Sequence, residues 1–337
     1  MPPAKLIREP GDQVRTDSDR NGTDGHGSTV EVPRIRPRDP VGKAVLAALA
    51  TALARIRTIE GDARRGDVDG IHRLRTTTRR LRSELRAFRD LLDPEWTGPI
   101  EAELKWLAGL LGDVRDLDVL TTRFRKAAGV EPGSEPEALA PLLGELTARH
   151  TRALRSLRKG LQGDRYRELL ATLQRAIDHP RLADEAGTPC RAAMPPLAAS
   201  AWRRLRKDAR ALRPSDPDEC FHQVRKRAKR ARYTAEMVAP VLGGSRARGA
   251  RRFIRRATRI QDILGEHQDA VVAAHELEEL LGRHGDNPAF AEAARRLLDG
   301  QAEAARDARH AFFGAWEKLD RKKARQWLKS TVKAGSP

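Results

Sequence analysis

The stretch that decides the fold is IHRLRTTTRRLR, which runs from Ile71 to Arg82. It returns in altered form as FHQVRKRAKRAR, from Phe221 to Arg232. In both stretches a histidine is followed by cations three, seven and ten residues later, which places all four side chains on one face of an α-helix. The apolar residues fall on a separate stripe. Each stretch therefore predicts an amphipathic helix with one cationic face and one buried face.

A second pair of motifs follows the first in the same order. LLGDVRD begins at Leu110 and ILGEHQD at Ile263. The offset between copies is 150 residues for the histidine motif and 153 residues for this one. Two motifs at nearly the same offset predict an internal duplication. Within them we expect Gly112 and Gly265 to allow close helix packing, and Arg115 with Asp118 to form an ion pair that orients the arginine.

Outward from these motifs the chain is predicted to be helical, with no convincing strand pattern. The expected fold class is all-α, with two pseudo-symmetric four-helix units joined by a linker over residues 179–190. In the first unit we expect helices to end at Gly61 and at Asp93-Pro94, and the last helix to be interrupted near Gly160 and Gly163. The predicted helices span residues 39–61, 69–92, 99–128, 137–178, 191–212, 218–239, 246–283 and 288–328.

Three segments describe the predicted domain organisation. Residues 1–38 are rich in Pro, Gly, Asp, Ser and Arg without a period, and we expect a disordered tail. Residues 39–330 form one domain, with the repeats over about 39–180 and 190–330. Residues 331–337 form a short C-terminal tail.

The charge balance points to a polyanionic partner. Lys and Arg number 65 against 47 Asp and Glu, a net charge of +18, which suits nucleic acid, acidic lipid or a phosphate polymer. The two cysteines, Cys190 and Cys220, have no metal-ligand spacing, so we expect neither a zinc cluster nor a disulfide scaffold. No apolar run reaches about 18 residues and no signal-peptide core occurs. The expected location is the cytoplasm.

We call the two cationic faces the ladders. Without a bound anion, the like charges within each ladder repel one another and destabilise the helix. Like charges three and four residues apart repel by a few tenths of a kcal/mol per pair, and a bridging anion would reverse that repulsion. The alternative interpretation is a solvated basic surface. For His72 and His222 the alternatives are phosphate binding and a capping or packing role near a helix start.

At these residues the chain resembles the CHAD family, the conserved histidine α-helical domain, over about residues 39–330. The resemblance implies two four-helix bundles around a central basic cavity that binds inorganic polyphosphate, location at polyphosphate granules, and no catalysis or cofactor. One departure is Gln268 and Val271 in the second copy, where the first has Arg115 and Asp118. The motifs that carry the resemblance are His72-x2-Arg75-x3-Arg79-Arg80-x-Arg82, Leu110-Leu111-Gly112-x2-Arg115-Asp116-x-Asp118, His222-x2-Arg225-Lys226-x2-Lys229-x2-Arg232-Tyr233 and Leu264-Gly265-x3-Asp269.

The candidate polyphosphate-binding residues combine both ladders with further basic positions. Arginine can grip phosphate oxygens with two hydrogen bonds at once, which suits a polymer that offers no bases to read. The stripe Arg252, Arg255 and Arg259 lines the same cavity or faces water. The full set is His72, Arg75, Arg79, Arg80, Arg82, Arg86, Lys105, Arg115, His222, Arg225, Lys226, Lys229, Arg230, Arg232, Tyr233, Arg252, Arg255 and Arg259.

Two other functions compete with polyphosphate binding. Nucleic-acid binding fits the charge, but only 4% of the residues are aromatic, which leaves little to stack on bases. A polyphosphate hydrolase or kinase needs carboxylates that hold a metal ion near the phosphate, and the cationic helices show no such cluster. Glu101-x-Glu103-x-Lys105 matches a motif of triphosphate tunnel enzymes, but it lies here in a helical pattern instead of a strand. The expected partners are polyphosphate and polyphosphate-metabolising enzymes, with no metal site.

Overall fold

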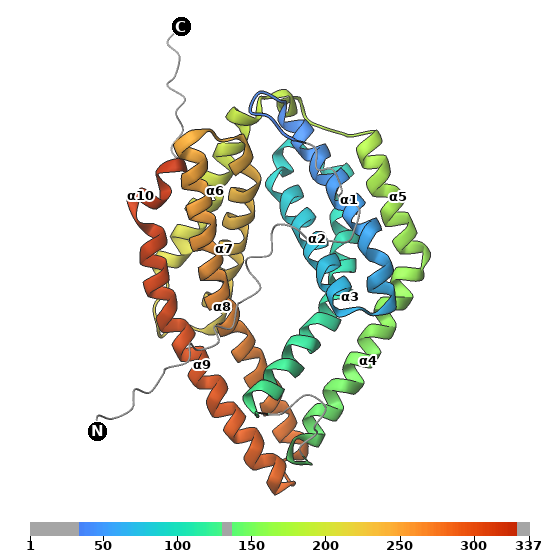
Figure 1. Ribbon diagram of the computed structural model, residues 1–337, viewed down its shortest axis with the longest axis vertical. Helices are drawn as coiled ribbons and strands as arrows, with labels where there is room; N and C mark the ends of the chain where they lie inside the picture. The colour runs from blue at the N-terminus through green and yellow to red at the C-terminus, as the bar shows by residue number, and fades with distance from the viewer. Residues whose placement is uncertain (1–33, 130–136, 329–337) are drawn as a thin grey trace, which may run out of the picture.

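The computed structural model describes residues 34–129 and 137–328, and over these ranges it is all-α with no strand. Figure 1 shows the helices in two groups side by side. Short 3-10 turns, such as η1 (Arg89–Leu91), connect several of them. The α-helices are α1 (Val41–Arg65), α2 (Val68–Ala87), α3 (Pro94–Ala127), α4 (Ala140–Gln162), α5 (Asp164–Asp178), α6 (Cys190–Ala211), α7 (Asp218–Val238), α8 (Gly244–His284), α9 (Pro288–Asp320) and α10 (Lys322–Arg325).

The two groups contain corresponding helices in the same order. In the first group α2 packs against α1 and α3, and in the second α7 packs against α6 and α8. The two histidine helices, α2 and α7, also contact each other and lie on either side of the middle of the molecule (Figure 1). The arrangement positions both ladders at the junction of the two groups. The duplication behind it stays a prediction.

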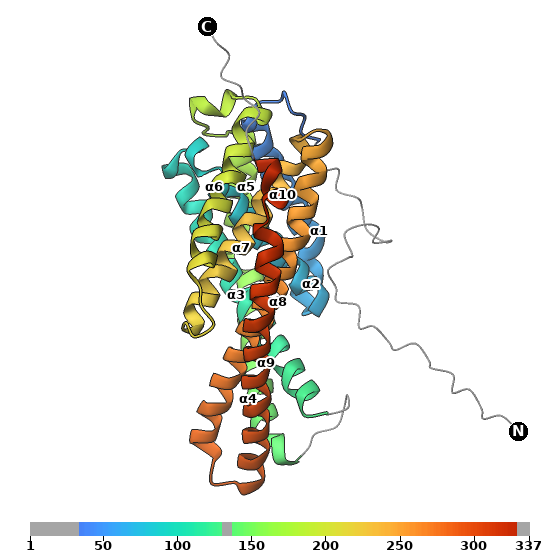
Figure 2. The same cartoon turned by 90° about the vertical axis from the view of Figure 1, so that its left-hand side faces the viewer.

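The groups meet a second time at the far end of the molecule. The long helices α3 and α8 extend beyond the histidine helices and join α4 and α9 there (Figure 2). Leucine and phenylalanine side chains from all four helices form a separate apolar core at this end, including Phe124, Leu142, Leu277 and Phe290, all fully buried. The α2–α7 contact and the contacts at this far end therefore hold the two groups together. No helix in the described ranges is long and apolar enough to cross a bilayer.

Capping residues mark the observed helix ends, and two of these ends differ from the predicted boundaries. The Asp67 carboxylate accepts from the Gly70 amide at 2.6 Å at the start of α2, and Asp93 accepts from the Glu95 amide at 2.9 Å at the start of α3. The predicted end at Gly61 is wrong, because α1 continues to Gly66, whose φ of 88° suits glycine. The predicted start of α3 at Pro99 is also wrong, since Asp93 and Pro94 begin the helix earlier.

The predicted packing role of Gly112 and Gly265 is wrong as well. A methyl group at Gly112 would lie no closer than 4.0 Å to any neighbour outside its own helix backbone, and one at Gly265 no closer than 3.9 Å. At Gly70, by contrast, a methyl group would come within 2.6 Å of the Asp62 side chain and 2.9 Å of the Ala63 backbone nitrogen. The crossing of α1 and α2 is therefore one at which glycine permits close backbone approach.

Candidate functional site

The middle parts of the two ladders converge where α2 meets α7. We call Arg75, Arg79, Arg225 and Lys229 the central cluster. Burial lowers the pKa of Arg225, and repulsion from Arg79 and Arg75 lowers it further. Burial also lowers the pKa of Lys229 to about 7, with added repulsion from the three arginines. Four cations from two helices thus lie within electrostatic reach of one another.

Two aspartates from the second motif balance part of this charge. Arg75 of α2 donates to Asp116 of α3 at 2.8 Å. Asp269 of α8 occupies the corresponding position in the second copy and offsets some of the repulsion on Arg225 and Lys229. Burial raises the pKa of Asp269. Asp116 and Asp269 therefore offset part of the charge, and the central cluster keeps an excess of positive charge.

Unused hydrogen-bond donors mark the same place. The Nε atoms of Arg79 and Arg225 are buried and have no hydrogen-bond partner among the described residues. The same is true of Arg82, further along α2. A buried donor without a partner costs about 1–3 kcal/mol. An anion that enters this region would satisfy donors that the folded protein leaves open.

The two histidines have different surroundings. His72 is exposed on α2, where partial burial and then the charges of Arg115, Arg79 and Arg75 lower its pKa. In the second copy Gln268 takes the place of Arg115, and its side-chain oxygen makes a short hydrogen bond with Nδ1 of His222. The replacement of arginine by glutamine therefore exchanges a repulsion for a hydrogen bond.

The ion pair expected between Arg115 and Asp118 is not among those that the described residues form. Instead, Asp118 of α3 lies 3.0 Å from Nε2 of His150 in α4. The charge of Arg115 acts on His72 of α2, whose pKa it lowers. Arg115 and Asp118 do lie three residues apart on one helix, but Asp118 pairs with a residue of another helix instead of with Arg115.

Further basic residues of the predicted set line two cavities beside the α2–α7 pair. Arg86 and Arg230 line a cavity of about 760 Å³, and Arg80 lines another of about 690 Å³. Arg80 donates to Glu84 at 3.0 Å, and Arg232 donates to Glu236 at 2.6 Å while its guanidinium lies 4.4 Å from the Tyr233 ring centre. Arg80, Arg86 and Arg230 thus line the two cavities outside the central cluster, whereas the ladder residues Arg82 and Arg232 line neither cavity.

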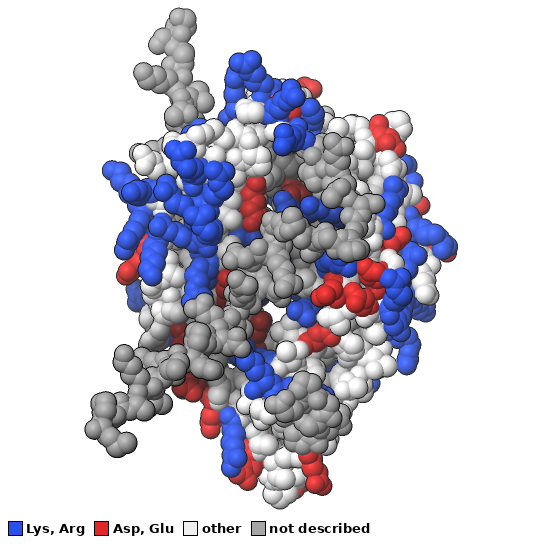
Figure 3. All heavy atoms as spheres, in the orientation of Figure 1, with Lys and Arg blue, Asp and Glu red and all other residues white. Residues whose placement is uncertain are grey.

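The other predicted residues lie on the outside. Lys226 approaches Glu219 at 3.4 Å on the surface of α7. Lys105 of α3 and the stripe of Arg252, Arg255 and Arg259 on α8 are exposed. Figure 3 shows Lys and Arg side chains gathered on the upper left face, where Figure 1 draws α8 and α10. Whether any of these residues binds polyphosphate stays a prediction.

Three arginines that line the larger cavity are absent from the predicted set. Arg227 lies within the FHQVRKRAKRAR motif but off the ladder face, Arg89 belongs to η1, and Arg204 belongs to α6. Only Arg227 had a signal in the sequence, its place in the repeated motif. Arg204 and Arg89 reach the cavity through the packing of α6 and η1, which no local pattern reveals.

Comparison with known proteins places these features in a family. The model of the CHAD domain matches residues 47–278. An uncharacterised protein of Mycobacterium tuberculosis H37Rv, Rv2226, is 31% identical over 261 residues, which cover 72% of this chain and 45% of that protein. An uncharacterised protein of strain CDC 1551, MT2285, matches to the same extent. The chain thus spans less than half the length of these curated relatives.

Solved structures share the fold. PptA from Streptomyces chartreusis aligns with a TM-score of 0.67 and 25% identity, over 82% of this chain and 99% of PptA. The CHAD domain from the plant Ricinus communis aligns with a TM-score of 0.61 and 22% identity, over 90% of this chain and 97% of that domain. The second similarity is one of fold alone.

Proposed function

The chain belongs to the CHAD domain family, and from this premise we propose that it binds inorganic polyphosphate at the central cluster without turning it over. The observation that supports the proposal is the convergence of four cations from α2 and α7, with buried guanidinium donors that have no partner among the described residues. We also propose that binding takes place in the cytoplasm at polyphosphate granules.

The chemistry of the ligand fits the chemistry of the cluster. A polyphosphate chain carries about one negative charge per phosphate unit, so consecutive units can bridge consecutive cations. Each guanidinium can offer two parallel N–H groups to one phosphate, and Lys229 acts as a point charge. Release of counterions from the polymer adds favourable entropy, by analogy with nucleic acids. The ligand would replace repulsion within the cluster by attraction.

The absence of turnover is part of the proposal. Within residues 34–129 and 137–328, no group of three or more histidine, cysteine, aspartate or glutamate side chains is placed to hold a metal ion. Asp116 and Asp269 lie near the cluster but are engaged with its cations. Incubation with long-chain polyphosphate and Mg²⁺ or Mn²⁺ should leave the chain length unchanged on gels. Phosphate release that a central-cluster substitution abolishes would contradict this part.

Calorimetric titration tests the binding itself. Long-chain polyphosphate and duplex DNA are titrated at equal phosphate concentration and physiological salt. We expect tighter binding of polyphosphate, since the cluster is confined to the contact between α2 and α7 and a bare phosphate chain is narrower than a duplex. The variant Arg79→Gln/Arg225→Gln should lose at least tenfold in affinity, because two charge-assisted contacts disappear.

A matched control separates this site from general charge. Arg295 and Arg306 are exposed on α9, outside the central cluster and both cavities. Arg295→Gln/Arg306→Gln removes the same charge and should leave affinity within about twofold. Equal losses in both double variants, or DNA binding as tight as polyphosphate binding, would favour a nonspecific polyanion binder.

A further inference from the structure

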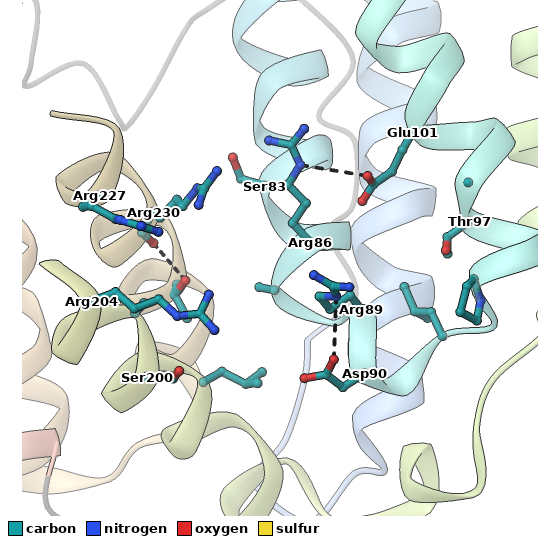
Figure 4. Close-up of a pocket in the computed structure, with 17 residues that line it drawn as sticks. Ser83, Arg86, Arg89, Asp90, Thr97, Glu101, Ser200, Arg204, Arg227 and Arg230 are labelled. Carbon is teal, nitrogen blue, oxygen red and sulfur yellow. Dashed lines mark hydrogen bonds and ion pairs between the residues drawn. The ribbon is translucent and has the colours of Figure 1, made fainter. Parts of the chain in front are cut away.

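The larger of the two cavities forms a groove between the two groups of helices. We call it the arginine groove and define it by Arg86, Arg89, Arg204, Arg227 and Arg230. Arg86 and Arg89 come from α2 and η1 of the first group, and the other three from α6 and α7 of the second. Figure 4 shows Arg204 and Arg230 reaching across the groove toward Arg89 and Arg86. The groove is therefore complete only because the two groups meet.

The acidic residues beside the groove neutralise it in part. Arg227 donates to Asp208 at 2.8 Å and so is committed to an ion pair. Arg86 and Glu101 are loosely paired at 3.9 Å, and the neighbours Arg89 and Asp90, both well exposed, lie 3.7 Å apart. Pairs of this kind are worth little in water. A ligand could displace them at small cost.

Two arginines of the groove have no acidic partner in the part of the chain that the structure describes. Within residues 34–129 and 137–328, the guanidinium groups of Arg204 and Arg230 make no ion pair and no hydrogen bond. Instead, partial burial and the charges of Arg227, Arg86 and Arg204 lower the pKa of Arg230. The guanidinium groups therefore repel one another across an open space, and an anion would remove that repulsion.

The cavity on the other side of the α2–α7 pair provides an internal comparison. We call it the paired groove; its charged lining residues are Arg34, Arg36, Arg55, Arg80, Glu84 and Glu236. The 150-residue offset aligns Arg80 with Arg230, Glu84 with Thr234, and Glu236 with Arg86. In the paired groove two glutamates thus stand where the arginine groove has a threonine and an arginine. At these aligned positions the glutamates form ion pairs with Arg80 and Arg232, whereas the arginine groove offers Arg230 no acidic partner among the described residues.

From these observations we infer that the arginine groove is a second anion-binding site, distinct from the central cluster, that takes a short oligophosphate. Its volume of about 760 Å³ has room for roughly 25 water molecules, more than a single phosphate needs and typical of small-ligand sites. The ligand is either a free oligophosphate or the end of a polyphosphate chain. The second source alone rests on the proposed function.

Titration with tripolyphosphate tests the site directly. Arg204→Gln/Arg230→Gln should weaken tripolyphosphate binding at least tenfold. Arg86→Glu, which copies the glutamate of the paired groove, should weaken it at least as much. The Arg295→Gln/Arg306→Gln control should change it by less than twofold. Because the groove substitutions remove repulsion, the unliganded variants should melt no lower than the wild type, which keeps a binding loss from being confused with unfolding.

The central variant Arg79→Gln/Arg225→Gln distinguishes the two sites. It should keep tripolyphosphate binding in the groove even where its affinity for long chains is lost. Tripolyphosphate binding that depends on the central variant and not on either groove variant would overturn the inference. Failure of the central variant to weaken long-chain binding would overturn the proposed function and leave the groove result standing.

Long-chain polyphosphate identifies the source of the ligand. If Arg204→Gln/Arg230→Gln also weakens long-chain binding, and does so more for shorter chains, the groove receives the end of the polymer. If long-chain affinity is unchanged while tripolyphosphate affinity falls, the ligand is a free oligophosphate. Either result supports a second anion site, and unchanged affinity for both ligands in both groove variants would refute it.

Discussion

Lys229 follows Arg225 by one turn of α7, and both side chains interact with Arg75 and Arg79 of α2. Burial is the main reason that the pKa of Lys229 falls to about 7, and repulsion from Arg225, Arg79 and Arg75 is the next. Asp269 opposes this shift without cancelling it. A pKa of about 7 places the titration of this lysine near neutral pH, and a neighbouring anion would favour its charged form.

Polyphosphate binding should weaken as the pH rises. A bound phosphate raises the pKa of Lys229, so binding takes up a proton in a solution near or above pH 7. We expect affinity to fall roughly tenfold between pH 6.5 and 8.5, measured by calorimetry at constant ionic strength. Proton uptake should also appear as a dependence of the binding enthalpy on the ionisation enthalpy of the buffer.

Lys229→Arg provides the control for this effect. Arginine remains charged throughout that range, so the variant should bind with a nearly flat pH profile. An unchanged slope in the variant would assign the proton to another group, of which His72 is the nearest candidate, since its pKa is also lowered.

Lys229 should also limit the stability of the unliganded protein. Its pKa in the folded state lies far below the usual lysine value, so the unfolded state binds more protons between about pH 7 and 10. This lysine therefore makes stability rise with pH over that window and is most unfavourable below it. Lys229→Met should raise the melting temperature at pH 6 more than at pH 9. An equal shift at both values would mean that packing, and not charge, controls the result.

Alanine substitution should distinguish the glycine that packs helices from those that do not. Gly70→Ala pushes a methyl group against Asp62 and the backbone of Ala63, and we expect a loss of about 1–3 kcal/mol in the free energy of unfolding. Gly112→Ala meets no neighbour closer than 4.0 Å in the middle of α3, and should gain up to about 1 kcal/mol. Urea denaturation of both variants measures the difference. A loss at Gly112 would restore the packing role inferred from its place in the motif.

The fold was predictable because the helices carry strong local signals. The apolar stripes of α2 and α7 repeat every three to four residues, which predicts both helices. The Asp93-Pro94 pair, by contrast, predicts a helix end but begins α3 in the structure. The boundaries shifted where two signals competed, as at Gly61, which lies inside α1 because Gly66 ends the helix. Local sequence patterns thus predict that the helices exist, whereas the residues at the turns determine where each helix ends.

For the candidate site, the sequence predicts which residues share one face of a helix, but not which residues of other helices they contact. The spacing of His72, Arg75 and Arg79 placed them together, and the repeat placed Arg225 and Lys229 in the corresponding positions. Which arginines gain an acidic partner depends on helices that are distant in the chain. Arg75 meets Asp116 of α3, and Arg204 enters a groove made by α6, and neither contact leaves a trace in local sequence.

The loop between α6 and α7 should depend on one buried histidine–arginine contact. Arg309 of α9 donates from Nε to Nε2 of His267 at 3.1 Å, and to the backbone oxygens of Pro214 and Asp216 at 2.9 and 3.0 Å. It also pairs with Asp218 at the start of α7. Arg309→Lys cannot reproduce this set of bonds, and we expect it to lower the free energy of unfolding by about 1.5–3 kcal/mol.

The same contact should make the protein sensitive to mild acid. His267 is only 1% exposed, and burial lowers its pKa despite the opposing effect of Asp218, with Arg309 adding repulsion. The unfolded state takes up a proton at the ordinary histidine pKa near 6.5, and the folded state does so only at lower pH. This contribution to stability is therefore complete above pH 6.5 and is lost as the pH falls. His267→Gln should melt at a temperature that changes less than that of the wild type between pH 7 and 5. Parallel melting curves for the two proteins would show that His267 does not titrate on unfolding.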